Sequence, residues 1–515
     1  MVAWIPSINS QRHARCSNCA DTGSKRCTLL GFLTVLSPLL ILWLGAAFYC
    51  LPCPDGDSRN YLLSTIEYQR TGVARYIYDN SIDGANEWFY PHGYLSQVVH
   101  AAIAPWPGNS GIYVANLLIF VSFTLLFLSF CLLAGVPCLI AIGTLLLSIS
   151  YLTPGNFRPE LLAAVIILAW LCGHLLVAKR TNARLASNLI ATVALALLGV
   201  TQPTDAILSA GFLSYALCFD RGRRAITDIV LIAVGSGVGV VAISEWLTGD
   251  FLRWFLLVFS QARSLDYWGG ASDTYFRYYI MGPTSLFLGF SLMTAVGALA
   301  IVHFARTRTM ANLADRILLH GVAGVVLVMT YAIGLRDPFT TYNLALFAPI
   351  VIALLWQDAR RLGKGRARAP LVLAFAIGVT GSVASISRNV IITATDLFRS
   401  DVISWTQIVA QIDNLRQANR ALAIDESFVS AVEGDKKQQL AGVFHTRMPS
   451  QEIKGVACLL LLKQSNSGYE TAPEIDGFDL IESRFVAAVR VFGLLYRTTK
   501  GYNYAIYHST RQACR

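Results

Sequence analysis

The sequence predicts a polytopic α-helical membrane protein of about 11 transmembrane helices, followed by a C-terminal α/β domain outside the membrane. Composition is the first reason, because 55% of the 515 residues are hydrophobic and only 14% are charged, unlike a chain folded entirely in water. The second is that apolar residues gather in runs long enough to cross about 30 Å of hydrocarbon. The third is the alternation of charge between successive loops.

Eleven apolar runs are predicted to cross the membrane, and the third, fifth and sixth are the shortest. An odd number of spans places the N-terminus and the final segment on opposite sides of the membrane. The runs cover residues 28–50, 112–134, 137–152, 160–178, 187–200, 206–219, 225–247, 284–305, 317–335, 339–356 and 370–392.

Charge along the loops tests this topology independently. Lys and Arg accumulate in cytoplasmic loops, and every second loop here is basic, whereas acidic residues match or outnumber Arg in the others. This predicts a cytoplasmic N-terminus and a final segment outside the cytoplasm. The topology accounts for the net charge of +10, so a nucleic-acid partner has no support. The basic loops lie at residues 12–26, 179–184, 221–224, 306–316 and 360–368.

The chain divides into three predicted parts: a cytoplasmic tail over residues 1–27, a transmembrane domain over 28–394, and a soluble extracytoplasmic α/β domain over 395–515. The transmembrane domain includes a long first outer loop, residues 51–110. Its first apolar run exceeds the h-region of a signal peptide, so we interpret that run as an uncleaved anchor. We expect a multi-pass protein of the cell inner membrane, since the chain has no Asn-x-Ser/Thr glycosylation site.

Local patterns in the C-terminal segment predict a helix and several strands. Apolar residues recur at helical spacing from Trp405 to Leu415. The runs at 421–424, 456–462 and 502–507 are typical of strands. Two pairs of cysteines are predicted to lie outside the cytoplasm, where each pair is either a disulfide or reduced and structural. These pairs are Cys50 with Cys53 and Cys458 with Cys514.

The first outer loop brings two carboxylates, Asp55 and Asp57, to the membrane surface. Asp57 can cap a helix that Gly72 ends, and we expect this helix to be amphipathic and to lie on the membrane. For Asp57 two roles remain open. It is either a helix cap alone or an acid–base group that meets a lipid-linked substrate at the water–lipid boundary. The apolar face of the helix consists of Tyr61, Leu62 and Ile66.

Asp57, Tyr61 and Gly72 form an Asp-x3-Tyr-x10-Gly pattern, which Tyr90-Pro91 follows before the chain re-enters the membrane. In this pattern the chain resembles the GT-C superfamily of polyprenyl-phosphate-sugar-dependent glycosyltransferases, particularly the protein O-mannosyltransferases and lipid A aminoarabinose transferases. The likeness covers most of the chain, because the topology also agrees: an inside N-terminus, a long first outer loop that bears the acid, and a soluble outer tail.

The resemblance implies that Asp57 is the family aspartate at the acceptor site. We also expect Asp55 to share the catalytic role, and Tyr61 and His92 to bind the substrate. The carboxylate would orient or deprotonate an acceptor hydroxyl for direct attack at the anomeric carbon, with inversion. The implied partners are a polyprenyl-phosphate sugar donor, an extracytoplasmic lipid, glycan or protein acceptor, and membrane lipids. Ser58 and His92 replace the Glu and the second Pro usual in the family, which leaves the subfamily open.

A lipid phosphate that leaves with growing negative charge needs cations or hydrogen-bond donors, and arginines on the outer face are the candidates. Arg158, followed closely by Glu160, and Arg336, next to Asp337, lie at tight junctions between spans. Each arginine either contacts the phosphate or pairs with its neighbouring carboxylate and fixes the topology. In Gln202-Pro203-Thr204-Asp205, the aspartate either assists catalysis or caps the next helix, and we favour the cap.

The sequence does not require a metal, although a divalent ion is possible. Either His92 or His100 could join the loop aspartates as a ligand, yet a histidine beside aromatic residues is usually structural. The Cys16-x-x-Cys19 pair near His13 is either a zinc site or two free thiols. The outer loop at residues 248–283 is rich in aromatic residues, which either cover the sugar or lipid or anchor the loop at the interface, and we favour the anchor.

Two other classes of function stay open beside a glycosyltransferase. A transporter or flippase is one, although no internal repeat of the kind found in many secondary transporters is visible. A non-enzymatic envelope assembly factor that uses the C-terminal segment as an interaction module is the other. No P-loop, GxSxG or HExxH pattern supports an ATPase, a serine hydrolase or a zinc protease.

Overall fold

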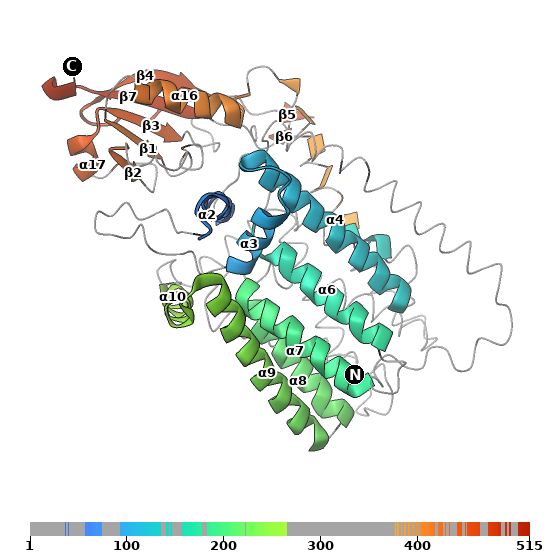
Figure 1. Cartoon of the computed structure of the whole chain (residues 1–515). Coiled ribbons are helices and arrows are strands. Elements are labelled where there is room, and N and C mark those ends of the chain that lie inside the picture. Colours follow the sequence, from blue (N-terminus) through green and yellow to red (C-terminus); the bar gives the residue numbers. More distant parts are fainter. Residues whose placement is uncertain are drawn as a thin grey trace, which may run out of the picture.

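A computed structural model of the chain contains a bundle of long helices and a small mixed sheet (Figure 1). Structural statements below refer to its described residues. These are 57–74, 93–134, 141–143, 145–146, 157–177, 183–221 and 223–264, scattered positions at 37, 40 and 376–399, and 402–514 with gaps at 418–420, 426–427, 429–431, 433–439, 445–448, 450, 464–471, 486–489, 492–493 and 496–502.

The long helices of the bundle follow five of the predicted apolar runs. They are α4 (Asn109–Ala134), α6 (Glu160–Val177), α7 (Ala183–Thr201), α8 (Pro203–Arg221) and α9 (Arg223–Thr248). In the described part of the chain, α4, α6, α7 and α9 are long and apolar enough to cross a membrane. The remaining predicted runs fall wholly or mostly outside the described residues, so the full set of eleven spans stays a prediction.

Apolar packing and small residues hold the bundle together. Phe120, Phe127 and Leu198 are fully buried or nearly so in its core. Helices α7 and α9 approach closely, because a Cβ on Gly235 would lie 2.8 Å from Thr192 and one on Gly239 would lie 2.7 Å from Ala196. Such close contact between backbones is typical of helices that pack within a membrane.

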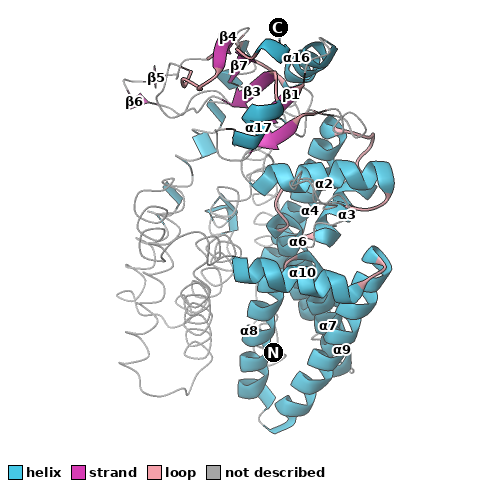
Figure 2. Cartoon of the chain, turned by 90° about the vertical axis from the view of Figure 1, so that its left-hand side faces the viewer, coloured by secondary structure: helices cyan, strands magenta, loops and turns pink. Residues whose placement is uncertain are grey.

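Two helices of the segment between the first two predicted spans cover one end of the bundle (Figures 1 and 2). Helix α2 (Asp57–Thr71) begins at the predicted residue and ends at Gly72, whose φ of 75° is the left-handed conformation that glycine adopts readily. Helix α3 (Tyr94–Ile103) follows after a second left-handed glycine, Gly93, with φ 67°. A glycine in the left-handed conformation therefore marks the end of α2 and the start of α3.

The prediction that α2 lies on the membrane with one apolar face was incomplete. Tyr61 and Leu62 pack against α4, but Leu63, on another side of the helix, is only 3% exposed and belongs to the core of the C-terminal domain. Helix α2 is thus enclosed between the bundle and that domain. Helix α2 therefore has two apolar faces, one against the bundle and one against the C-terminal domain.

A short helix, α10 (Phe251–Ser264), lies across the end of the bundle after a turn at Gly249 (Figure 2). Its Trp254 is 3% exposed and packs with Tyr94 of α3 and Val200 of α7. The sequence presented this region as an aromatic-rich loop, so the helix over its first part is a correction. Other apolar residues of α10 do not pack in the core: Leu252, Phe255 and Leu256 are exposed.

The C-terminal segment forms a five-stranded sheet of order β2-β1-β3-β7-β4. Strands β2 and β3 are both parallel to β1, which lies between them, whereas β7 is antiparallel to β3 and β4 is antiparallel to β7. The elements are α16 (Trp405–Gln417), β1 (Leu422–Asp425), β2 (Gly442–Phe444), α17 (Gln451–Val456), β3 (Leu459–Lys463), β4 (Phe478–Arg484), β7 (Tyr504–Ser509) and η6 (Gln512–Cys514), with a separate pair β5 (Arg490–Val491) and β6 (Leu494–Leu495).

Alternate side chains of the sheet face two apolar cores. One core includes Ile424, Leu461 and Ile506 and is covered by α16 and by Leu63 of α2. The other includes Leu460 and Tyr507, with Ile453 of α17 packed against it. The helix and three of the strands agree with the sequence prediction, whereas α17, β2 and β4 were not predicted.

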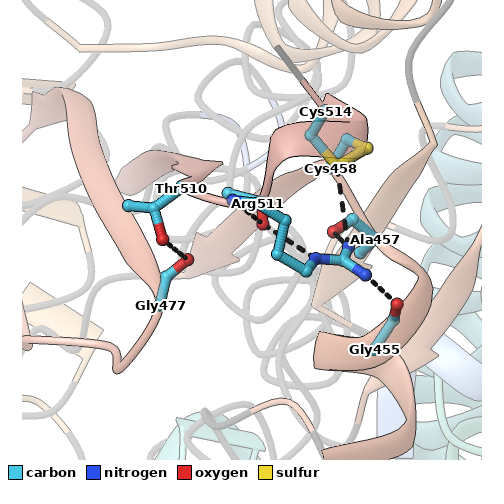
Figure 3. The surroundings of a disulfide bond; sticks show 8 residues. Gly455, Ala457, Cys458, Gly477, Thr510, Arg511 and Cys514 are labelled. Atoms are coloured by element: carbon cyan, nitrogen blue, oxygen red, sulfur yellow. Dashed lines mark hydrogen bonds between the residues drawn. A yellow bond between two sulfur atoms is a disulfide. The ribbon is translucent and has the colours of Figure 1, made fainter.

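A disulfide joins Cys458, just before β3, to Cys514 at the end of the chain, with a Cα–Cα distance of 5.3 Å (Figure 3). The sequence had left this pair open between a disulfide and free thiols. Beside it, the Arg511 guanidinium donates to the carbonyls of Gly455 and Ala457, at the end of α17. A cation at this position satisfies carbonyls that the helix leaves unpaired. The predicted partner pair Cys50 and Cys53 lies outside the described residues.

Candidate functional site

The first turn of α2 meets the segment that leads into α6. Asp57 is the first residue of α2, and Tyr61 follows one helical turn later. Tyr61 is 2% exposed and shares an apolar cluster with Tyr113 of α4 and with Phe157. A Cβ on Gly93 would lie 3.0 Å from the Tyr61 ring and 3.0 Å from Pro159. Gly93 therefore separates Tyr61 from Pro159 by little more than its own backbone.

On either side of Pro159, Arg158 and Glu160 form a buried ion pair. Arg158 Nε donates to Glu160 Oε1 at 3.0 Å, and Arg158 Nη2 lies 2.9 Å from the same oxygen. Their side chains are 12% and 4% exposed, respectively. Glu160 is also the first residue of α6, where an acidic side chain is favoured by the helix dipole. Of the alternatives predicted for Arg158, pairing with the neighbouring carboxylate is observed.

A second carboxylate, Asp205, lies close enough to Glu160 for the two charges to repel each other. Asp205 is in the first turn of α8 and is 0% exposed. The sequence favoured a capping role for it, but within the described residues neither of its carboxylate oxygens has a hydrogen-bond partner. The capping interpretation was therefore wrong. Its position in the first turn still suits the helix dipole.

His100 of α3 has both ring nitrogens engaged. Nδ1 lies 2.6 Å from the Ser96 carbonyl oxygen and Nε2 lies 2.9 Å from the Asn116 amide. Burial lowers the pKa of His100, which favours the neutral ring. The atom of Asn116 that faces Nε2 is its side-chain oxygen Oδ1. His100 is thus a structural link between α3 and α4.

The described residues contain no cluster of three or more His, Cys, Asp or Glu side chains that could hold a metal. His100, one of the possible ligands, is occupied by its two partners. Asp55, His92 and Arg336 lie outside the described residues, as does the Cys16–Cys19 pair. Asp57 is described as part of helix α2, and its side chain is not. The predicted roles of these residues stay predictions.

At the opposite end of α7 a second buried carboxylate is fully paired. Asp228 of α9 is 1% exposed, and Arg184 Nη2 lies 2.8 Å from its Oδ1. Asn188 donates a further hydrogen bond to the same oxygen at 2.9 Å. This arrangement ties α7 to α9 and leaves Asp228 no open position for chemistry. The contrast marks the Glu160–Asp205 region as the less satisfied of the two carboxylate environments.

The structure brings together three predicted site residues, Tyr61, Arg158 and Glu160, at the end of the bundle that α2 and α3 cover. It adds Gln202, the residue just before α8, and Ser209 within that helix, neither of which the sequence analysis singled out. Their signal was present in the spacing of Gln202, Asp205 and Ser209, which is that of one helical face. The arrangement offers fixed positive charge from Arg158 and carboxylate oxygens from two helices, beside the helix that starts at Asp57.

Comparison with protein-family models found no match to this chain, and comparison with curated proteins found none either. The functional argument therefore depends on the residues and their geometry.

Proposed function

We propose that the protein is an integral-membrane glycosyltransferase that moves a sugar from a polyprenyl-phosphate carrier to an acceptor outside the cytoplasm. The observation that carries the proposal is the position of α2. The helix that begins at Asp57 is held between the bundle and the C-terminal domain, and its Tyr61 lies next to the segment of the Arg158–Glu160 pair. A membrane-tethered donor would meet an acceptor at such a junction.

In the proposed reaction Asp57 accepts the proton of an acceptor hydroxyl as its oxygen attacks the anomeric carbon. The new glycosidic C–O bond forms while the bond from that carbon to the phosphate oxygen breaks. Polyprenyl phosphate leaves with the bonding electron pair, and the anomeric configuration inverts. Positive charge close to the leaving oxygens stabilises the transition state. Arg158 is proposed to supply part of that charge, and Glu160 to act as the positioning residue that fixes its guanidinium.

The pairing of the C-terminal domain with α2 also supports the proposed topology. Leu63 of the first outer loop and Ile408 of α16 belong to one core, so the loop and the domain must lie on the same side of the membrane. The Cys458–Cys514 disulfide suits an oxidising compartment. We therefore propose an inner-membrane protein with a cytoplasmic N-terminus and an extracytoplasmic C-terminal domain.

The function can be tested by mass spectrometry of lipid-linked sugars in cells that lack the protein, compared with cells that carry wild type, Asp57→Asn or Asp479→Asn. Asp479 lies on the exposed strand β4 and is the matched control. We expect one polyprenyl-phosphate sugar to accumulate in the null and Asp57→Asn cells, and to return to its normal level with wild type and Asp479→Asn.

Equal membrane levels of each variant would be confirmed by immunoblotting. Unchanged lipid pools in the null would sink the glycosyltransferase proposal and favour a transporter or an assembly factor. If the lipid-linked sugar accumulates in the null cells but stays at its normal level with Asp57→Asn, Asp57 has no catalytic role.

The proposed orientation has its own test. Cells are quenched with a thiol-blocking reagent before lysis, and peptides are mapped without reduction. A cross-linked peptide pair containing Cys458 and Cys514 is the expected result. Alkylated, unlinked cysteines would place the domain in a reducing compartment and overturn the orientation.

A further inference from the structure

The N-terminal part of α8, together with the residue before it, carries buried polar side chains. Gln202, Asp205 and Ser209 are 4%, 0% and 2% exposed. Their spacing of three and then four residues puts them on the same face. Further along this face the buried side chains are Leu213 and Leu217, which pack in the apolar core of the bundle. Polar residues at this depth need partners or a ligand.

Among the described residues, five oxygen atoms on this face and on Glu160 have no hydrogen-bond partner. They are Glu160 Oε2, Gln202 Oε1, Asp205 Oδ1 and Oδ2, and Ser209 Oγ. All five are lone-pair donors of the type that hard cations bind. Two of them, Gln202 Oε1 and Ser209 Oγ, belong to uncharged groups. The set therefore combines carboxylate oxygens with neutral oxygen ligands.

Of the two carboxylates described here, only Glu160 has an ion-pair partner among the described residues. Arg158 directs two nitrogens at Glu160 Oε1, which offsets the charge of one carboxylate and leaves Oε2 without a partner. Burial, followed by repulsion from Glu160, raises the pKa of the Asp205 carboxyl, so this group needs a nearby cation to stay ionised at neutral pH. A buried, unpaired carboxylate is strongly unfavourable unless a cation or a proton neutralises it.

We propose that Glu160, Gln202, Asp205 and Ser209 form a binding site for a divalent cation that prefers oxygen ligands, of the class of Mg²⁺, Mn²⁺ and Ca²⁺. The ion would neutralise Asp205 and tie the first turn of α8 to the first turn of α6. The donor set contains no sulfur or imidazole, which sets it apart from a structural zinc site. The inference does not depend on the proposed transferase activity, because it follows from burial, charge and donor type.

The test is titration of the purified, chelator-treated full chain with Mn²⁺, followed by the loss of the electron paramagnetic resonance signal of free Mn²⁺. We expect saturable binding that Mg²⁺ or Ca²⁺ displaces. Asp205→Asn should weaken it by more than the ~10-fold that changes to outer-shell residues typically cause. Asp228→Asn is the matched control, since Asp228 is equally buried but paired with Arg184 and Asn188, and binding should be unchanged.

Ser209→Ala removes one neutral ligand without changing charge, so it tests the site even where Asp205→Asn does not fold. We expect it to weaken Mn²⁺ binding to a smaller degree. The proposal is overturned if wild type binds no Mn²⁺ at neutral pH, the result expected of a proton on Asp205. It is overturned equally if Asp205→Asn or Ser209→Ala binds as wild type does. These readouts are independent of the lipid-linked sugar assay, so either proposal can fail alone.

Discussion

Arg158 holds a single oxygen of Glu160 from two nitrogens, with Nε at 3.0 Å and Nη2 at 2.9 Å from Oε1. A bidentate pair would use both carboxylate oxygens, whereas here Oε2 is left without a partner among the described residues. The pair joins the segment before α6 to the first residue of that helix. It therefore fixes both the direction of the guanidinium and the direction of the second oxygen.

Removal of one member of this pair should destabilise the protein more than removal of both. Glu160→Met leaves the Arg158 guanidinium buried without its carboxylate, for which we expect a loss of about 3 kcal/mol. The double variant Arg158→Met, Glu160→Met should recover much of that loss, because two apolar side chains replace two desolvated charges. Thermal unfolding in detergent measures both. Equal melting temperatures for the single and double variants would contradict the buried-pair interpretation.

Gly93 should tolerate a methyl group less well than Gly72 does. Both have a positive φ, so Ala at either position costs about 1–2 kcal/mol of backbone strain. Only at Gly93 would the Cβ also lie 3.0 Å from Tyr61 and Pro159, whereas nothing lies within 4 Å at Gly72. We expect Gly93→Ala to lower both the melting temperature and transfer activity further than Gly72→Ala. Matching values would show that Tyr61 and Pro159 move apart at little cost.

Leu63→Ala should weaken the attachment of the C-terminal domain to α2. Leu63 is 3% exposed within the domain core, and truncation of a buried leucine costs about 2–5 kcal/mol. Ile481→Ala on β4 is the control, since Ile481 is 58% exposed and its truncation should have little effect. Limited proteolysis in detergent should cleave Leu63→Ala faster within α2. Equal cleavage of the two variants would remove Leu63 from the interface.

The C-terminal domain should lose stability in strongly alkaline solution. Burial, followed by repulsion from Glu482, raises the pKa of Tyr504 to about 12, and its hydroxyl donates to Glu482 at 3.1 Å. An unfolded tyrosine titrates near ~10, so the stabilisation is fully present below that pH and is lost as pH rises through the folded pKa. Protease resistance of the domain should fall between pH ~10 and 12. Tyr504→Phe should reduce this pH dependence; an unchanged profile would exclude Tyr504 as its source.

Long apolar runs predicted the bundle helices to within a few residues, because burial in hydrocarbon requires a continuous apolar stretch. Helix α2 was predicted with the correct start and with Gly72 at its end, since capping and glycine signals are local. The second contact of α2 was not predicted, because Leu63 faces a domain more than three hundred residues later in the chain. The edge strands β2 and β4 also escaped prediction, since β2 has only three residues and β4 is largely exposed.

The candidate site could be predicted only in part for the same physical reason. Arg158 and Glu160 are neighbours in sequence, so their pairing was among the alternatives. The environment of Asp205 depends on tertiary burial and on the influence of Glu160 from another helix, which no local pattern encodes. The residue that normally caps a helix is the one before its first turn; Asp205 lies inside the first turn of α8, and neither of its oxygens has a hydrogen-bond partner among the described residues.

The shared core of Leu63 and the C-terminal domain also sets an order of events during synthesis. Helix α2 is translated near the beginning of the chain, yet the surface that covers Leu63 is made last. Until the ribosome has released the final strands, the Leu63 side chain has no domain core to pack in and stays exposed. A chain cut short before the tail would keep its membrane helices but never finish the loop that carries Asp57.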